Sequence, residues 1–229
     1  MRSHVEIIEK EMERSLLWLR DDMPHRRLAA CAVLHQLAEY APTIFFQHSL
    51  EFFSSIWGPL RDNKNEIRFA AARSLSACLA VLKNRKHHLQ SYCNIYEQIV
   101  IGLRKKTKEE THGSLIVIVE MLRHTDSFML PRFREICQAI LHLKDHRSRT
   151  VRSAIISLLP ELAAFCPETF ARVFLTESLD MLILNTDNRD LKKQSLLAIG
   201  RLALAIGYRP SLERRVPEIA SVVTRYFDS

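Results

Sequence analysis

Glycine and proline are scarce in this chain. Its 229 residues include 5 Gly and 8 Pro, about half of the share that average usage would give. So few turn formers leave little room for β-hairpins. The glycines, at positions 58, 102, 113, 200 and 207, cannot form a phosphate-binding glycine loop or a Gly-x-Ser-x-Gly nucleophile elbow. We therefore expect a mostly helical protein with no nucleotide or other cofactor.

Long uncharged runs are also missing. No stretch free of Asp, Glu, Lys and Arg is longer than the 11 residues 40–50, well short of the roughly 20 apolar residues that a membrane span needs. Residues 1–4 lead directly into an acidic segment, without the apolar stretch of a secretory signal. We expect no membrane insertion and a cytoplasmic location.

Cysteine and histidine show no metal-binding arrangement. The five cysteines are separated by 47, 15, 44 and 29 residues, which fits neither a disulfide framework nor a zinc module. Their apolar surroundings suit buried thiols in a reducing compartment. His142 and His146 are one helical turn apart, but no third ligand stands beside them. We interpret them as solvated side chains and predict no metal site.

Paired acids do not indicate catalysis either. Asp21 and Asp22, and Glu109 and Glu110, stand at predicted helix starts, where carboxylates stabilise the helix dipole. Because no nucleophile, base and orienting acid occur together in a recognisable pattern, we predict no catalytic residue in this chain.

Apolar residues recur at helical spacing along almost the whole sequence. The apolar segments run for about 15 to 20 residues and are separated by short polar clusters such as 61–65 and 186–190, which supply caps and turns. We predict about eleven helices, starting near residues 3, 24, 43, 65, 88, 109, 131, 149, 168, 189 and 213.

A repeat is visible in the residue that opens every second helix. Arg27, Arg68, His112, Arg152 and Lys192 follow one another at steps of 41, 44, 40 and 40 residues. A second internal match aligns residues 37–45 with 162–170, a shift of 125 residues. Helix pairs that repeat every 40 to 47 residues are typical of HEAT and armadillo solenoids.

We therefore predict an all-α, right-handed α-solenoid of about five HEAT-type helix pairs in one segment, 1–229. The expected repeats are 3–41, 42–84, 86–125, 126–166 and 167–207, with a trailing helix at 212–228. One face should be lined by the helices at 24–40, 65–82, 109–123, 149–165 and 189–206. The trailing helix is still apolar on one side, at Ile219, Val222 and Phe227, which suggests a fragment of a longer array.

Five aromatic residues gather in the segment 45–57. Phe45, Phe46, Phe52, Phe53 and Trp57 have spacings of 7 and 4 residues, which predicts an aromatic face on a single helix. Packing between repeats is the first interpretation of this face, and a groove for a partner is the second.

The positive charge is concentrated in one repeat. Between residues 83 and 108 there are seven Lys or Arg and one acid, Glu97, while the net charge of the whole chain is +7. The seven are Lys83, Arg85 and Lys86 before the predicted helix 88–104, and Arg104, Lys105, Lys106 and Lys108 after it. Either they are solvated helix ends, or they bind an acidic partner. We name them as partner-binding candidates and expect no nucleic acid, because no aromatic residues are interleaved with them.

Several stretches carry a resemblance that periodicity alone could not give. They are residues 5–19, 26–30, 41–47, 67–79, 112–115, 158–167 and 198–203. In this order they resemble the amino-terminal HEAT region of the target-of-rapamycin (TOR) protein kinases. Animal members of that family carry a long insertion between the helices around Val119 and Ile136, where this chain has only a short connection.

The resemblance implies a non-catalytic scaffold segment of a large serine/threonine kinase of the phosphatidylinositol-kinase-related family. In that family such a region docks Raptor-like or Rictor-like subunits and helps to receive a Rheb-type small GTPase. The parent complex would be dimeric and cytoplasmic, with recruitment to a lysosomal or vacuolar surface through partners. The alternative is a stand-alone HEAT adaptor, such as a transport or phosphatase scaffold protein.

Overall fold

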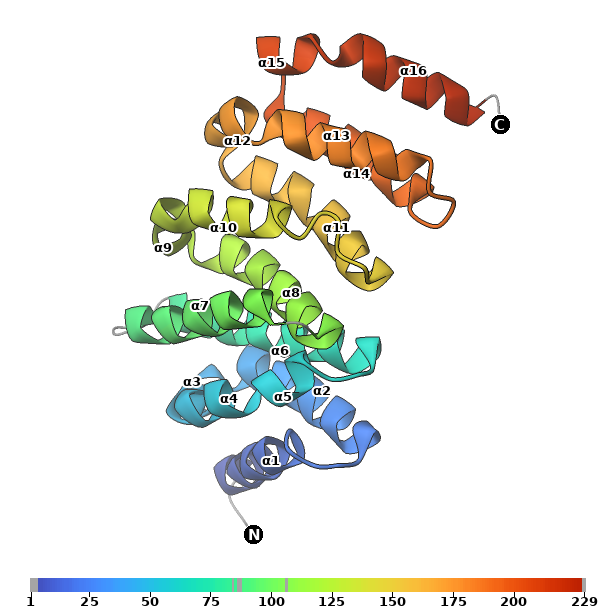
Figure 1. The fold of residues 1–229 in the computed structure, drawn as a ribbon. Coiled ribbons are helices and arrows are strands. Elements are labelled where there is room, and N and C mark those ends of the chain that lie inside the picture. Colours follow the sequence, from blue (N-terminus) through green and yellow to red (C-terminus); the bar gives the residue numbers. More distant parts are fainter. Residues whose placement is uncertain (1–3, 84, 86–87, 106, 228–229) are drawn as a thin grey trace. The chain divides into compact units, whose positions relative to one another are not determined.

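Helices joined by short turns make up the described part of the chain (Figure 1). The computed structural model describes residues 4–83, 85, 88–105 and 107–227. These residues include no strand and no helix that is long and apolar enough to cross a membrane. Two compact units divide the chain, Met1–Met129 and Leu130–Ser229.

The first unit contains α1 to α9. Their bounds are α1 (His4–Trp18), α2 (Pro24–Tyr40), α3 (Pro42–Gln47), α4 (Ser49–Ser55), α5 (Trp57–Leu60), α6 (Asn65–Lys83), α7 (His88–Arg104), α8 (Lys108–His124) and α9 (Asp126–Met129). Helix α6 packs between α2 and α8, while α1 packs on α2 and α7 packs on α8. The long helices α2, α6 and α8 therefore form one layer of this unit.

The second unit repeats the arrangement with two long helices. It contains η1 (Leu130–Arg132), α10 (Phe133–Leu141), α11 (Arg149–Phe165), α12 (Pro167–Val173), α13 (Leu175–Thr186), α14 (Lys192–Ile206), α15 (Pro210–Glu213) and α16 (Val216–Phe227). Helix α14 packs on both α11 and α13, and α16 packs on α13. Within each unit, the long helices predicted to share a face do pack side by side.

Each predicted start position has an observed helix that begins within three residues of it, whereas α4, α5, α9 and α13 have no predicted counterpart. Proline is the first residue of α2, α3, α12 and α15, where its missing N–H costs no hydrogen bond. Thr107 caps α8 by accepting a hydrogen bond from the Glu110 N–H, and Gly207 ends α14 at φ +68°, a conformation that glycine adopts without strain. Proline, one threonine cap and one glycine thus mark several of the boundaries that the sequence predicts.

The first helix of several predicted pairs is interrupted, which the sequence pattern does not predict. Residues 42–60 form α3, α4 and α5 rather than one helix, so the single aromatic helix is wrong. Backbone angles leave the helical region at His48, and Pro131 lies in η1 between α9 and α10, where a helix would lose a hydrogen bond. Phe45 and Phe52 are fully buried, with ring centroids 5.2 Å apart.

Repeat positions seven residues after the opening cation form the core. Leu34, Leu75, Leu159 and Ile199 are buried, as the periodicity predicts. Val119 is only half-buried, and its neighbour Ile118 is fully buried instead.

Three of the five cysteines are buried and two are half-buried, and all are free thiols. Cys31, Cys78 and Cys137 lie in the core, where burial raises the pKa of the Cys31 thiol to about 12 and also raises that of the other two. Cys93 and Cys166 are half-buried. The prediction of buried thiols is therefore right for three of the five.

Candidate protein-docking surface

The periodic arginines share one contact with the turn that precedes their helix. Arg27 Nη1 donates to the Asp21 carbonyl at 2.7 Å, and Arg152 Nη1 donates to the His146 carbonyl at 2.7 Å. Arg68 makes the equivalent bond to the Asp62 carbonyl. In each case the acceptor lies six residues earlier, so the repeated cation ties the start of a long helix to the turn before it.

In the first unit the same arginines also join neighbouring repeats. Arg27 Nε donates to Asp62 Oδ2 at 2.7 Å, and the exposed fractions of the two side chains are 17% and 3%. Arg68 Nε donates to His112 Nδ1 at 2.9 Å. These two contacts link α2 to the turn before α6, and α6 to α8.

His112 is held in its neutral form by this arrangement. A ring nitrogen that accepts from Arg68 carries no proton of its own. Burial lowers the pKa of His112 to about 4, and the adjacent Arg68 charge adds to the effect. Burial likewise lowers the pKa of Arg68. Because His112 serves as a buried hydrogen-bond acceptor, the geometry gives it a structural role.

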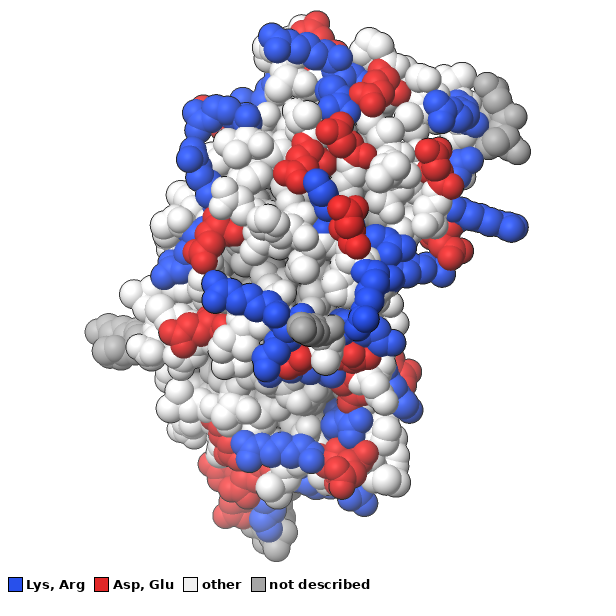
Figure 2. Space-filling model, in the orientation of Figure 1, with Lys and Arg blue, Asp and Glu red and all other residues white. Residues whose placement is uncertain are grey.

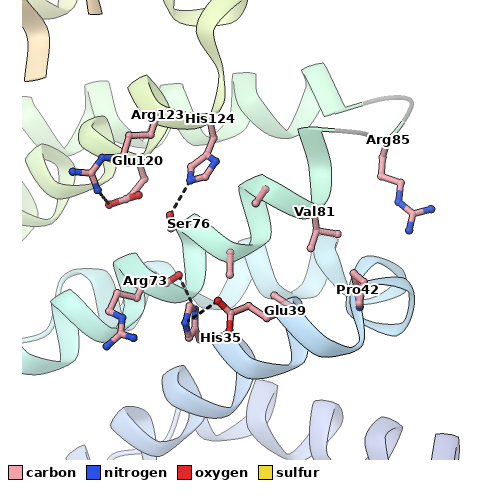
Figure 3. Close-up of a pocket in the computed structure, with 13 residues that line it drawn as sticks. His35, Glu39, Pro42, Arg73, Ser76, Val81, Arg85, Glu120, Arg123 and His124 are labelled. Atoms are coloured by element: carbon pink, nitrogen blue, oxygen red, sulfur yellow. Dashed lines mark hydrogen bonds and ion pairs between the residues drawn. The ribbon is translucent and has the colours of Figure 1, made fainter. Parts of the chain in front are cut away.

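A groove of about 780 Å³ follows α6 between α2 and α8 (Figure 3). Its α2 wall includes His35 and Glu39, and its α8 wall includes Glu120, Arg123 and His124. Small side chains line it along α2 and α6, at Ala38, Ala77 and Ala80. It lies entirely within the first unit.

Hydrogen bonds fix the polar groups of the two walls. His35 Nδ1 lies 3.3 Å from the Arg73 carbonyl oxygen and its Nε2 lies 3.5 Å from Glu39 Oε1. Opposite, His124 Nε2 is 2.8 Å from Ser76 Oγ. Burial lowers the pKa of His124. The two imidazoles therefore connect the walls to α6.

Glu120 places a carboxylate in the same groove. Its Oε1 lies 3.3 Å from Arg123 Nη1, while its buried Oε2 has no hydrogen-bond partner in the part of the chain that the structure describes. A buried carboxylate oxygen without a donor is unusual in a folded protein. It therefore offers an acceptor to a bound molecule.

Two arginines stand at opposite ends of the groove (Figure 3). Arg73 is exposed, and within the described residues its guanidinium has no ion pair. Arg85 is half-buried, with its guanidinium carbon 5.0 Å from the centre of the Phe46 ring. Both ends of the groove are thus positively charged.

The predicted basic residues fall into two separate places. Lys83 is exposed at the end of α6 and Arg85 lines the groove, while Lys86 lies outside the described residues. Arg104 and Lys105 are exposed at the end of α7, and Lys108 is exposed at the start of α8; Lys106 is also outside the described part. Figure 2 shows Lys and Arg side chains where α7 ends and α8 begins. The structure therefore brings only the first cluster to the groove.

The sequence analysis missed most of the groove. Arg73, His35 and His124 are not singled out by the sequence, because no local motif or local excess of charge marks them. The sequence does contain one signal for these residues, which is the number of residues between the partners that meet in the groove. His35 and Arg73 are 38 residues apart and Ser76 and His124 are 48 apart, close to one repeat step, which places such pairs on neighbouring helices.

The remaining polar candidates make hydrogen bonds near helix starts. The described residues contain no group of three His, Cys, Asp or Glu that could hold a metal. His146 Nδ1 accepts a hydrogen bond from the Ser148 N–H at 3.0 Å, and Glu110 accepts from the Thr107 hydroxyl at 2.5 Å. Both side chains organise helix starts.

Comparison with known proteins identifies relatives over nearly the whole chain. The serine/threonine-protein kinase TOR of Oryza sativa subsp. japonica is 35% identical over 204 residues, which is 87% of this chain and 8% of the kinase. The kinase tor1 of Schizosaccharomyces pombe is 31% identical over 221 residues, 95% of this chain and 9% of the kinase. This chain is homologous to a segment of the TOR kinases. No protein-family model matches it.

Solved structures similar to this TOR-related chain are armadillo repeat proteins. The designed armadillo repeat protein YIII(Dq.V1)4CPAF, in complex with the peptide (KR)4, has a TM-score of 0.59 at 13% identity and covers 95% of this chain and 90% of its own. A second designed protein, YIII(Dq)4CqI, has a TM-score of 0.53 at 14% identity, with coverage of 94% and 87%. The prediction of an all-α repeat solenoid is confirmed.

Proposed function

We propose that this chain is a non-catalytic HEAT scaffold from the amino-terminal region of a TOR serine/threonine kinase. The proposal rests on one observation. The matched segments cover nearly all of this chain but only 8–9% of each kinase. Kinase activity, of the phosphatidylinositol-kinase-related type, would belong to other parts of the parent protein. The role of this segment is to present surfaces to other subunits.

The partners we propose are protein subunits of the TOR complexes. Raptor-like and Rictor-like subunits are the first candidates, and a Rheb-type small GTPase is the next. The parent complex would be dimeric and would work in the cytoplasm, reaching a lysosomal or vacuolar surface through these partners. Stacked helix pairs support this role, because they offer extended surfaces on rigid elements.

The two basic clusters are proposed as contacts of that scaffold. The described members are exposed or half-buried at the two ends of α7. In their exposed positions they contribute little to folding stability. Charge of this kind acts mainly on the rate and salt dependence of association.

A direct test is a pull-down of the purified 229-residue chain with Raptor-like and Rictor-like subunits, followed by kinetics of any complex. Reversing Arg104, Lys105, Lys106 and Lys108 to Glu should slow association with an acidic partner and flatten its salt dependence. The melting temperature should remain nearly unchanged. Absence of binding to either subunit would contradict the scaffold proposal, and unchanged kinetics would remove these four residues from it.

A further inference from the structure

We propose that the groove along α6 binds an extended acidic peptide segment of a partner protein. Arg73 and Arg85 would each hold one acidic side chain, and the segment between them would lie over the small residues of the groove. This inference rests on the proposed docking role of the chain, and it adds the chemistry of the occupant. It depends on the groove geometry and charge described above.

The distance between the two arginines sets the length of the occupant. They are 12 residues apart on and just beyond α6, which corresponds to roughly 18 Å along a helix axis. An extended peptide advances about 3.3 Å per residue. Two acidic side chains about five or six residues apart would therefore reach both arginines.

The lining of the groove suits a main chain that runs close to α6. Ala77 and Ala80 present only a methyl group, so a peptide backbone can approach the helix closely. Peptide N–H groups then come near the α8 wall. One of them can donate to Glu120 Oε2, the buried oxygen that has no donor within the described residues.

The charge balance of the groove favours an anionic occupant. Three arginines line it, Arg73, Arg85 and Arg123, against two acids, Glu39 and Glu120. Glu120 lies beside Arg123 at 3.3 Å. Within the described residues Arg73 has no ion pair with an acid. The groove therefore has unbalanced positive charge. A basic peptide would meet repulsion at both ends.

The test measures binding of short fluorescent peptides to the purified 229-residue chain by anisotropy. The probe has blocked ends and two Glu separated by five Ala or Ser residues. One matched peptide has Lys in place of both Glu, and another has the two Glu adjacent. We expect the spaced Glu peptide to bind at least about tenfold more tightly than either matched peptide, with an affinity that falls as salt rises.

Variants of the chain locate the site. Arg73→Glu combined with Arg85→Glu should weaken the spaced Glu peptide by at least about tenfold. The matched control, Arg104→Glu combined with Lys105→Glu, reverses the same number of charges outside the groove and should change the affinity by less than about twofold. Ala80→Trp should block the groove without altering its charge. Circular dichroism and melting curves should show that each variant folds.

Three results would overturn the proposal: equal affinity for the Glu and Lys peptides, equal loss in the groove and control variants, or full displacement of the probe by inorganic phosphate at matched ionic strength. No binding of the spaced Glu peptide up to about 1 mM would overturn it as well. The scaffold proposal is tested separately by the subunit pull-down. Subunits that bind while the peptide does not would leave a docking scaffold whose contacts lie outside this groove.

Discussion

The joints between neighbouring long helices differ in the two units. In the first unit Arg27 meets Asp62, and Arg68 meets His112, in mostly buried contacts. In the second unit the first turns of α11 and α14 are joined by neutral groups, with Ser153 Oγ donating to Gln194 Oε1 at 2.7 Å and Gln194 Nε2 donating to the Ser153 carbonyl at 2.9 Å. Farther along the same two helices Arg201 pairs with Glu161 at 2.6 Å, and the exposed fractions of these side chains are 58% and 24%. The repeat step is similar in both places.

This difference shows that the repeat sets which positions form the contact between neighbouring long helices, but not which residue types make that contact. The second unit also has an ion pair between α11 and the turn before α14, Arg149 with Asp190 at 3.1 Å, but the exposed fractions of these side chains are 60% and 58%. Exposed pairs contribute little to stability. A buried charge that loses its partner is costly, so the first unit should be the more sensitive to substitutions and to acid at its joints.

The largest effects should come from the core and should be similar in the two units. Leu34 in α2 and Leu159 in α11 are both fully buried. Leu34→Ala and Leu159→Ala should each lower the free energy of unfolding by about 2 to 5 kcal/mol, as measured by chemical denaturation. A loss below about 1 kcal/mol at either position would mean that its side chain lies outside the core.

Substitutions at the contacts between long helices should cost more stability in the first unit than in the second. Asp62→Ala removes the carboxylate that accepts from Arg27 Nε and from the Lys64 N–H, so we expect a loss of about 3 kcal/mol. Gln194→Ala removes only neutral hydrogen bonds from a half-buried site and should cost about 1 kcal/mol. Equal losses, measured in the same denaturation experiments, would contradict the comparison.

Acid should weaken the first unit through His112. Its pKa is about 4 in the folded protein and near 6.5 when unfolded, so the unfolded state binds more protons between these values. Stability is therefore fully present above pH 6.5 and is lost as the pH falls toward 4, by about 3 kcal/mol. Denaturation curves at a series of pH values measure this loss.

His112→Gln is the matched control, because an amide can accept from Arg68 without titrating. The variant should reduce the dependence on pH in this window. His124, whose pKa burial also lowers, supplies the remainder. A pH profile identical to that of the original chain would show that His112 does not carry the effect.

A smaller difference concerns two glycines in long helices. A Cβ at Gly113 in α8 would lie 2.1 Å from the Leu60 carbonyl oxygen, whereas one at Gly200 in α14 would meet nothing within 4 Å. Gly113→Ala should therefore lower the free energy of unfolding by about 1 to 2 kcal/mol. Gly200→Ala should raise it by about 0.5 to 1 kcal/mol, and a gain from both substitutions would contradict the close approach of α8 to Leu60.

Helix positions were predictable because their causes are local. Pro24, Pro42 and Pro167 stand at helix starts, and the repeated arginines bind carbonyls only six residues away. The break at His48 had no comparable signal, since neither proline nor glycine stands there. That bend accompanies burial of Phe45 and Phe52 in the tertiary core, which a local pattern does not encode.

The candidate site was harder to predict because its residues meet across repeats. Arg85 was found from a local excess of charge, but Arg73 and His124 come from different helices and have no basic neighbours of that density. Whether His112 is a donor or an acceptor depends on Arg68, which is 44 residues away. Such roles become visible only when neighbouring helices are placed together.

Each unit has one cysteine that is not fully buried and to which a dye could be attached. Cys93 belongs to the first unit and Cys166 to the second, while the other three thiols are buried and stay protonated at neutral pH, because burial raises their pKa. Accessible thiolates add to maleimide reagents, so the unaltered chain should take up a donor and an acceptor dye at these two positions. Energy transfer between the dyes would then follow the separation of the two units in solution, and how it changes when a partner binds.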